Sequence, residues 1–427
     1  MSRIRSTRQF SLSWPKVPPA AALAAALLPL GACTTSTTGP AAEPLQSLPR
    51  NLTAPERSVI GSSNDFAFDL FREVNAAETE ENVFVSPLSV SMALGMTMNG
   101  AAGQTRDEMR STLRFGDLSQ PEINGAYRGL IDLLQNLDPT VEMGIANSVW
   151  YRQEFPFDQP FFDTVGNAFD AKVAALDFNA RSATTTINDW VNERTRGRIP
   201  TIIDEISADA VMFLINAIYF KGSWRQEFDP ADTRDAPFTG LDGSTTRVRM
   251  MSTSASVRTG GTPDYQVIDL PYGNGAYSIT ILLPGIDRNV NDVIAGLDGN
   301  DWSALVAGLG QPHELPIAMP RFRLEYEKVL NETLAALGMP TAFTDLADFS
   351  GMSATAGQDL SLSEVKHKSF IEVNEEGTEA AAVTSVGVVV TSMPMELRVD
   401  RPFLFAIRER FSGTILFLGK IVLPAEE

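Results

Sequence analysis

Apolar residues in the first part of the chain recur at helical spacing. They repeat every four positions over Phe66–Val74, directly behind residues 63–65, whose polar side chains can cap a helix. A second helix is predicted with Ser86 as its N-cap and Pro87 at its first position, and its apolar run ends at Met98, where an Asn-Gly pair follows. The pattern therefore predicts helices beginning near residues 63–65 and at Pro87.

Later segments have the patterns of strands. Residues 211–220 form an apolar run interrupted only by Asn216, which is typical of a central strand covered on both faces. Over 365–373 polar and apolar positions alternate, and this alternation places His367 on the apolar face. Two apolar runs within 403–423 predict a C-terminal hairpin. With helices dominating the first half and strands the second, the fold class is α+β with mixed or antiparallel sheets.

The body of the chain is predicted to be one large domain. Between residues 64 and 424 there is no Pro/Ser-rich linker, repeat or low-complexity stretch. The whole chain has 427 residues, of which 44% are hydrophobic, with 24 Phe and 5 Trp. That composition can fill a sizeable core and excludes wholesale disorder.

Charge and residue counts exclude other classes. A net charge of −19 makes nucleic acid a poor partner, because phosphate binding needs clustered Lys and Arg. A single Cys cannot form an internal disulfide, and two His leave little material for a metal site. We therefore expect no metal and no cofactor.

Hydrolytic catalysis is also not expected. The base of a catalytic triad would have to be His313 or His367. His313 lies in a loop-like stretch and is interpreted as a surface residue. His367 is interpreted as a buried histidine held by hydroxyls or a backbone carbonyl. Because the chain also lacks a Gly-x-Ser-x-Gly elbow and a glycine-rich phosphate loop, it is not predicted to be an enzyme.

The N-terminus has the layout of a signal peptide. Residues 1–16 carry basic but no acidic side chains, and an apolar stretch over 20–30 follows that is too short to span a membrane. The block Leu30-Gly31-Ala32-Cys33 resembles the bacterial lipobox, in which the cysteine is lipidated and becomes the new N-terminus. An ordinary signal peptide with a chance Cys is the alternative. The lipobox reading predicts an exported lipoprotein attached to the membrane through Cys33.

A tether is predicted to follow Cys33, because the next 20 residues are rich in Thr, Ser, Pro, Ala and Gly. The assignment is residues 1–32 as signal peptide, 33–60 as lipidated Cys and flexible tether, and 61–427 as the folded domain. By resemblance to bacterial sorting patterns, Thr34 in the second mature position favours the outer membrane, on either its periplasmic or its outer face.

Residues 374–394 combine the properties of a strand and a loop. At period two, the positions from Thr378 to Val390 that share one face are all small or β-branched and uncharged. Gly377, the Ala run and Pro394 disfavour a permanent strand. From the residues alone, a plain buried strand or a connection without function remains an equal alternative.

This segment closely resembles the hinge of inhibitory serpins, the serine protease inhibitor family. Other blocks match the family in its order along the chain, from about residue 64 to 424. They are residues 82–89, 99–105, 191–199, 213–224, 269–272, 319–322 and 400–405.

The resemblance implies a fold of about nine helices and three β-sheets, with an exposed reactive-centre loop at about 375–398. It also implies suicide inhibition, in which a serine protease cleaves the loop and is trapped as a covalent acyl-enzyme when the loop inserts into the main sheet. The protein is expected to act as a monomer.

Matched residue by residue, the resemblance assigns three groups of positions. The hinge is Glu375, Gly377, Thr378, Glu379, Ala380, Ala381 and Ala382. The shutter, beneath the strands that part, is Ser86, Ser89, Asn216 and His367. The breach, where the loop first enters the sheet, is Trp224, Arg321 and Glu375, with Arg321 and Glu375 resembling an ion pair.

Counting along the family pattern from both ends of the loop gives the scissile bond Thr391-Ser392, with a register error of one or two residues left open. A small, β-branched, uncharged residue before the cut suits elastase-like or subtilisin-like proteases. Two alternatives to an inhibitory serpin remain: a serpin-fold binding protein that never inserts its loop, and an unrelated hydrolase.

Overall fold

The computed structural model describes residues 43–378 and 396–425. The described helices are α1 (Ala54–Ala77), α2 (Pro87–Met98), α3 (Gly103–Thr112), α4 (Gln120–Leu134), α5 (Gln159–Phe169), α6 (Ser182–Arg194), α7 (Val290–Ala295), α8 (Gly299–Ala307) and α9 (Asn331–Ala336). The strands are β1 (Val83–Val85), β2 (Val141–Arg152), β3 (Lys172–Leu176), β4 (Met212–Ser223), β5 (Arg234–Thr239), β6 (Thr245–Thr262), β7 (Tyr265–Pro271), β8 (Tyr277–Pro284), β9 (His313–Pro320), β10 (Phe322–Val329), β11 (Lys366–Val373), β12 (Gly377–Thr378), β13 (Leu397–Arg398), β14 (Phe403–Glu409) and β15 (Ile415–Ile421).

Helix α1 begins about ten residues before the predicted start. Thr53 and Glu56 form a capping box, in which the Glu56 carboxylate accepts from the Thr53 backbone N–H at 2.7 Å. The polar residues at 63–65 lie inside the helix, and Asn64 uses its side chain to donate to Gly413 O and to accept from the Ile415 N–H. The predicted start was therefore wrong, because Asn64 serves a tertiary contact to the C-terminal hairpin.

The predicted tether over 33–60 was also too long. Residues 54–60 are helical, and Leu45, Leu48 and Leu52 pack against the core. The Leu45 N–H donates to Asn274 O at 2.9 Å, so the folded part of the chain already includes residue 45.

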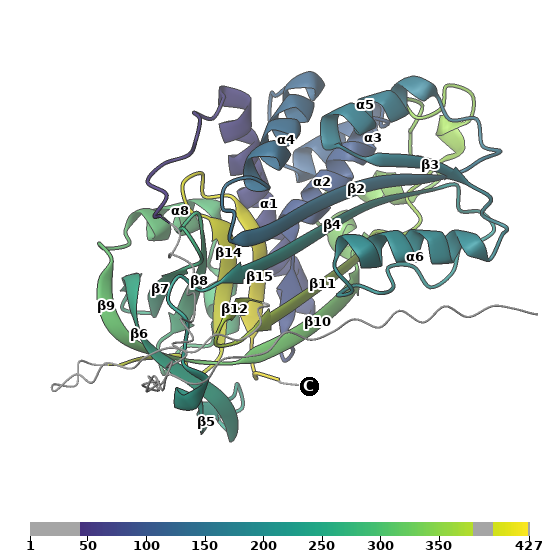
Figure 1. The fold of residues 1–427 in the computed structure, drawn as a ribbon. Helices are drawn as coiled ribbons and strands as arrows, with labels where there is room; N and C mark the ends of the chain where they lie inside the picture. Colours follow the sequence, from purple (N-terminus) through teal and green to yellow (C-terminus); the bar gives the residue numbers. More distant parts are fainter. Residues whose placement is uncertain (1–42, 379–395, 426–427) are drawn as a thin grey trace, which may run out of the picture. The chain divides into compact units, whose positions relative to one another are not determined.

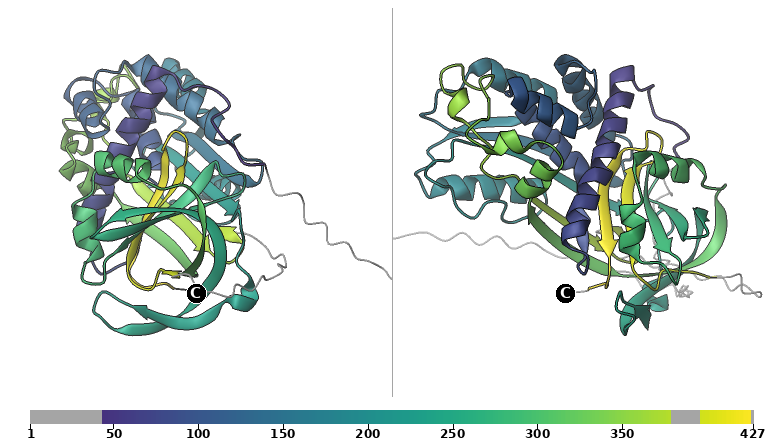
Figure 2. Two further views of the ribbon diagram at one scale, coloured as in Figure 1. Left: turned by 90° about the vertical axis from the view of Figure 1, so that its left-hand side faces the viewer. Right: turned by 180° about the vertical axis from the view of Figure 1, so that it is seen from behind.

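Two hydrogen-bonded sheets hold the described strands (Figures 1 and 2). The first has the order β1-β15-β14-β8-β7-β6-β9-β13, with β5 also paired to β6, and the second has the order β10-β11-β12-β4-β2-β3. The long strand β6 pairs with β7 at its end and with β5 and β9 over the rest. Two of the three expected sheets are thus continuous through β6.

Most other predicted elements are confirmed. Helix α2 begins at Pro87 behind the N-cap Ser86 and ends at Met98, and strands β4, β11, β14 and β15 lie where the pattern predicts them. The alternation along β11 buries every second residue, including His367. Long strands such as β2 also occur in the half where helices were expected to dominate.

The second sheet lies between two apolar layers. On its inner face α2 packs against β4 and contributes to the main core. On its outer face α6 forms a separate cluster with β2 and β4, which includes Trp150, Ile187 and Trp190 (Figure 1). No helix among the described residues is both long and apolar enough to cross a bilayer.

Candidate functional site

The site lies where the short strand β12 separates two long strands of the second sheet. Gly377 and Thr378 pair with Ser223 and Gly222 of β4, and Thr378 also pairs with Val373 of β11. From Thr378 toward the starts of β4 and β11, these two strands form no pairs with one another within the described ranges. Two neighbouring strands therefore present unpaired edges to each other, and we call the space between them the seam.

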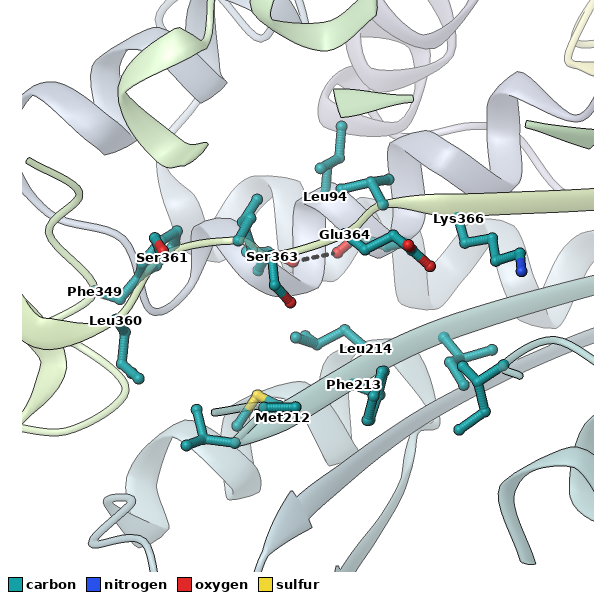
Figure 3. Close-up of a pocket in the computed structure, with 18 of the residues that line it drawn as sticks. Leu94, Met212, Phe213, Leu214, Phe349, Leu360, Ser361, Ser363, Glu364 and Lys366 are labelled. Carbon is teal, nitrogen blue, oxygen red and sulfur yellow. Dashed lines mark hydrogen bonds between the residues drawn. The ribbon is translucent and has the colours of Figure 1, made fainter. Parts of the chain in front are cut away.

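A cavity of about 430 Å³ occupies the part of the seam farthest from β12 (Figure 3). One wall is the start of β4, from Met212 to Asn216, and the opposite wall is the segment from Asp359 to Lys368. Helix α2 forms the floor with Ser89, Val90, Ala93, Leu94 and Thr97. A smaller cavity lies between Ile218–Phe220 of β4 and Phe370–Glu372 of β11, next to Thr378.

Trp224 lies at the end of the seam nearest β12. Its indole Nε1–H donates to Asn374 O at 2.8 Å, and its backbone N–H donates to Glu376 O at 2.8 Å. The indole stacks on the Tyr272 ring with centroids 4.6 Å apart. Trp224 thus attaches the start of β12 to the end of β4 through main-chain and side-chain bonds.

Glu375 is a buried carboxylate with two partners. Thr233 Oγ1 donates to its Oε1 at 2.5 Å, and Arg321 Nη1 lies 3.6 Å from the same oxygen. The Glu375 side chain is 8% exposed and that of Arg321 is 36% exposed. The ion pair expected from the resemblance is present, but the shorter bond comes from Thr233, a residue that the sequence analysis did not single out.

Gly377 allows the chain to enter the sheet at this point. A Cβ at position 377 would lie 2.1 Å from Gly222 O, and the residue has φ +154°. No residue with a side chain fits that approach. Directly after it, Thr378 is buried and its hydroxyl shares a hydrogen bond of 2.7 Å with the Tyr272 hydroxyl. Burial raises the pKa of Tyr272, so this hydroxyl stays protonated.

The four expected shutter residues form one connected cluster beside the larger cavity. The Ser86 backbone N–H donates to His367 Nε2 at 3.1 Å, and the Ser86 hydroxyl accepts from the Ser89 N–H at 3.4 Å. The Ser89 hydroxyl donates to Asn216 O at 3.2 Å. These bonds connect α2 to β11 and, separately, to β4, on the two sides of the seam.

The orientation of the Asn216 amide is fixed by Asn147, a buried residue that the sequence analysis missed. Asn147 donates to Phe169 O at 2.6 Å, so its own oxygen remains to accept from Asn216 Nδ2, also at 2.6 Å. Within the part of the chain that the structure describes, the buried Asn216 Oδ1 has no hydrogen-bond partner. A free acceptor therefore lies on the β4 side of the seam.

His367 supplies a free donor on the β11 side. Burial lowers its pKa to about 4, so the ring is neutral at pH 7. Because Nε2 accepts from Ser86, the proton must be on Nδ1, which has no hydrogen-bond partner among the described residues. His367 is 5% exposed and lines the larger cavity. The prediction that His367 is buried is confirmed, but its partner is the Ser86 backbone N–H and not a hydroxyl or a backbone carbonyl.

The remaining predicted positions divide into two groups. His313 is exposed as expected, but it is the first residue of β9 and not part of a loop, because it pairs with Val257 of β6. Seven predicted positions lie outside the described residues: Glu379, Ala380, Ala381, Ala382, Thr391, Ser392 and Cys33.

Tyr272 was noted only as part of a family block, and its contact with Thr378 could not be predicted from the sequence. No group of His, Cys, Asp and Glu in the described ranges is arranged to hold a metal ion.

Comparisons with known proteins agree with this architecture. A family model described as serpin (serine protease inhibitor) matches residues 61–424. Serpin B11 of Homo sapiens is 33% identical over 387 residues, covering 84% of this chain and 98% of that protein. The leukocyte elastase inhibitor of Sus scrofa is 35% identical over 376 residues, covering 84% and 97%.

Comparison with solved structures supports the same fold. Human thyroxine-binding globulin complexed with thyroxine superposes with a TM-score of 0.80 at 30% identity, covering 87% of this chain and all of that one. The thermophilic serpin tengpin in its native state superposes with a TM-score of 0.79 at 32% identity, covering 90% and 97%. The predicted α+β serpin fold is confirmed, and the named inhibitors among these relatives agree with the expectation that the chain is not an enzyme. From its order of elements, its matched blocks and these relatives, the chain belongs to the serpin family.

Proposed function

We propose that this protein is a suicide inhibitor of serine proteases that traps its target by inserting the reactive-centre loop into the seam. The observation that carries the proposal is the seam itself. Between β12 and the starts of β4 and β11, the edges of these two strands face each other unpaired. Unpaired backbone groups favour an added strand that would satisfy them. β12 already supplies the first two residues of such a strand.

The register of β12 fixes where the rest of the loop would go. Each further loop residue would move one position back along β4 and along β11. If the loop continued in the register of the pairs Thr378–Gly222 and Thr378–Val373, Thr384 would lie opposite both Asn216 and His367. A threonine hydroxyl is both a donor and an acceptor, so it matches the free Asn216 Oδ1 and the free His367 Nδ1–H.

Trapping depends on the relative rates of two steps, loop insertion and hydrolysis of the acyl-enzyme. The protease serine oxygen attacks the carbonyl carbon of the residue before the cut, the peptide bond breaks, and the new amine leaves with the C-terminal part of the chain. Hydrolysis of the remaining ester would free the protease. Inhibition requires the loop to insert first, into a sheet that gains hydrogen bonds and buried area.

The proposed scissile bond is Thr391-Ser392, which lies outside the described residues. Its small, uncharged side chain before the cut suits an elastase-like or subtilisin-like protease with a shallow pocket. The similarity to leukocyte elastase inhibitors supports the same choice.

The alternative is a serpin-fold binding protein that does not insert its loop. The likeness to thyroxine-binding globulin complexed with thyroxine favours it. The hinge argues against it, because Thr378, Ala380 and Ala382 are small and uncharged at the positions that must enter a packed interior.

A panel of serine proteases tests the proposal. Mixing the body of the protein with each protease should give an SDS-stable adduct and a stoichiometry of inhibition near one for at least one elastase-like or subtilisin-like enzyme. The loop-cleaved form should melt tens of degrees higher than the intact form, and mass spectrometry of the released fragment should find Ser392 at its N-terminus. Cleavage without an adduct or a thermal shift would favour the binding protein.

The same proposal includes export and anchoring through a lipidated Cys33 in a bacterial outer membrane, supported by the lipobox-like block. Cys33→Ser should leave the protein without fatty acid and release it to the soluble fraction. A wild-type protein that is itself soluble and unlipidated would contradict this part alone.

A further inference from the structure

Four arginines gather beside β7 and the turn that joins it to β8: Arg225, Arg258, Arg408 and Arg410. Arg408 is fully buried, and its Nη2 donates to Asp269 Oδ1 at 2.8 Å. Arg410 Nε and Arg258 Nη1 lie 3.7 Å and 4.0 Å from the other oxygen of the same carboxylate. One carboxylate therefore serves three guanidinium groups.

Two of the four, Arg225 and Arg410, flank the turn itself. Arg410 Nη1 donates to Gly275 O at 2.8 Å, and Arg225 Nη1 donates to Asn274 O at 3.2 Å. A Cβ at position 275 would lie 3.0 Å from the first nitrogen and 3.3 Å from the second, so both groups approach the same point. Burial lowers the pKa of Arg410, and the charges of the other three arginines act in the same direction. Two like charges are thus held side by side.

Other carboxylates near the turn do not neutralise these two groups. Asp138 accepts from the backbone N–H groups of Thr140 and Asn274, at 2.9 Å and 2.7 Å. Glu409 accepts from the Ser412 N–H at 2.6 Å. Neither carboxylate forms an ion pair with an arginine or a lysine in the described part of the chain. The cluster therefore keeps an excess of positive charge, although the chain as a whole carries −19.

The donors that remain free call for a ligand with several acceptor oxygens. Arg225 is exposed, and its Nε and Nη2 have no partner among the described residues. Arg410 Nη2 also has none there and, unlike Arg410 Nε, it is not buried. A carboxylate has only two oxygens for donors that come from two separate elements. A phosphate monoester offers three oxygens and about two negative charges at pH 7, and arginine forks match its geometry.

We propose that Arg225 and Arg410 bind a phosphate monoester group. Its oxygens accept from Arg225 Nε and Nη2 and from Arg410 Nη2, while the two deeper arginines add positive charge. The Leu45 N–H donates to the same Asn274 oxygen as Arg225, so the site lies where the described chain begins. The group belongs to a phospholipid headgroup or to free phosphate, and only the first source rests on the proposed anchoring through Cys33.

Calorimetric titration of the full chain with inorganic phosphate tests the site. Phosphate should bind at one site, and Arg225→Gln should weaken binding at least about fivefold. Arg247→Gln is the matched control, because Arg247 is also exposed and also donates from one nitrogen to a backbone carbonyl, that of Asp235. Acetate should bind at least about tenfold more weakly than phosphate. Absent phosphate binding, or an equal loss in the two variants, would overturn the proposal.

Vesicles separate the two sources of the phosphate group. The mature chain with Cys33→Ser, which carries no lipid of its own, is sedimented with phosphatidylcholine vesicles with and without phosphatidic acid. Binding that requires phosphatidic acid and is lost in Arg225→Gln supports the headgroup. Phosphate binding without vesicle binding supports free phosphate. Vesicle binding that Arg225→Gln leaves unchanged would count against the site.

These assays are independent of the proposed inhibition. They contain no protease, so a chain that binds phosphate but forms no SDS-stable adduct would refute the inhibitory function and leave the site intact. A normal adduct together with absent phosphate binding would do the reverse.

Discussion

Replacement of Thr384 by valine tests the insertion register directly. Valine keeps the size and β-branching of threonine and replaces the hydroxyl with a methyl group. In the register set by β12, this hydroxyl would meet Asn216 Oδ1 and His367 Nδ1–H, neither of which has a partner within residues 43–378 or 396–425. The variant should therefore leave both groups unsatisfied after insertion.

The expected magnitude follows from these two groups. Each unsatisfied buried donor or acceptor costs about 1–3 kcal/mol, so the inserted form should lose about 2–6 kcal/mol for the two groups. The uninserted form should be unaffected, because Asn216 Oδ1 and His367 Nδ1 are already unsatisfied there. The effect is thus confined to one of the two states.

Guanidinium denaturation of the intact and loop-cleaved proteins measures both states. The midpoint of the cleaved form should fall for Thr384→Val and stay constant for Ser385→Val, whose side chain would face the opposite side of the inserted strand. The intact midpoints should be alike. A loss in Ser385→Val, or an equal loss in the intact and cleaved forms of Thr384→Val, would refute the register.

Three further predictions concern the hinge and the shutter. Thr378→Arg should convert the inhibitor into a substrate, raising the stoichiometry of inhibition well above one, because an arginine cannot replace a side chain that is 3% exposed and bonded to Tyr272. Glu379→Arg, which the alternation of an inserted strand would put on the opposite face, should have a small effect. Gly377→Ala should displace β12 and slow adduct formation, since its Cβ would lie 2.1 Å from Gly222 O, whereas Gly61→Ala in α1 meets no atom within 4 Å and serves as control. The lowered pKa of His367 means that the unfolded chain takes up a proton first as the pH falls, so the free energy of unfolding should decrease from about pH 6.5 to about pH 4 by roughly 3 kcal/mol. Urea denaturation of wild type and His367→Gln across that range should show a shallower dependence in the variant, and identical slopes would exclude His367 as the cause.

Sequence periodicity predicted the elements that build the seam but not the seam itself. Alternation along 365–373 correctly placed His367 inside, and the apolar run around Asn216 correctly predicted a central strand. Neither pattern carries information about the distance between β4 and β11, which are separated by about 150 residues of sequence. The roles of Tyr272, Thr233 and Asn147 depend on that tertiary arrangement, and for this reason the sequence did not single them out.

The errors near the N-terminus have a different cause. Residues 34–53 have the composition of a linker, yet Leu45, Leu48 and Leu52 are partly buried against the core and the Thr53–Glu56 capping box starts a helix. Composition averages over such a stretch, whereas three well-placed leucines and one capping pair are enough to fold it.

The folded segment that starts at Leu45 limits how far the inhibitor can stand from a membrane. If the proposed lipid is attached to Cys33, 12 residue steps separate it from Leu45, and a fully extended chain of that length spans at most about 43 Å. A free tether to residue 60 would have spanned at most about 97 Å. The contact between Leu45 and Asn274 therefore more than halves the radius within which an anchored molecule can meet a protease, and favours targets that work close to the lipid surface.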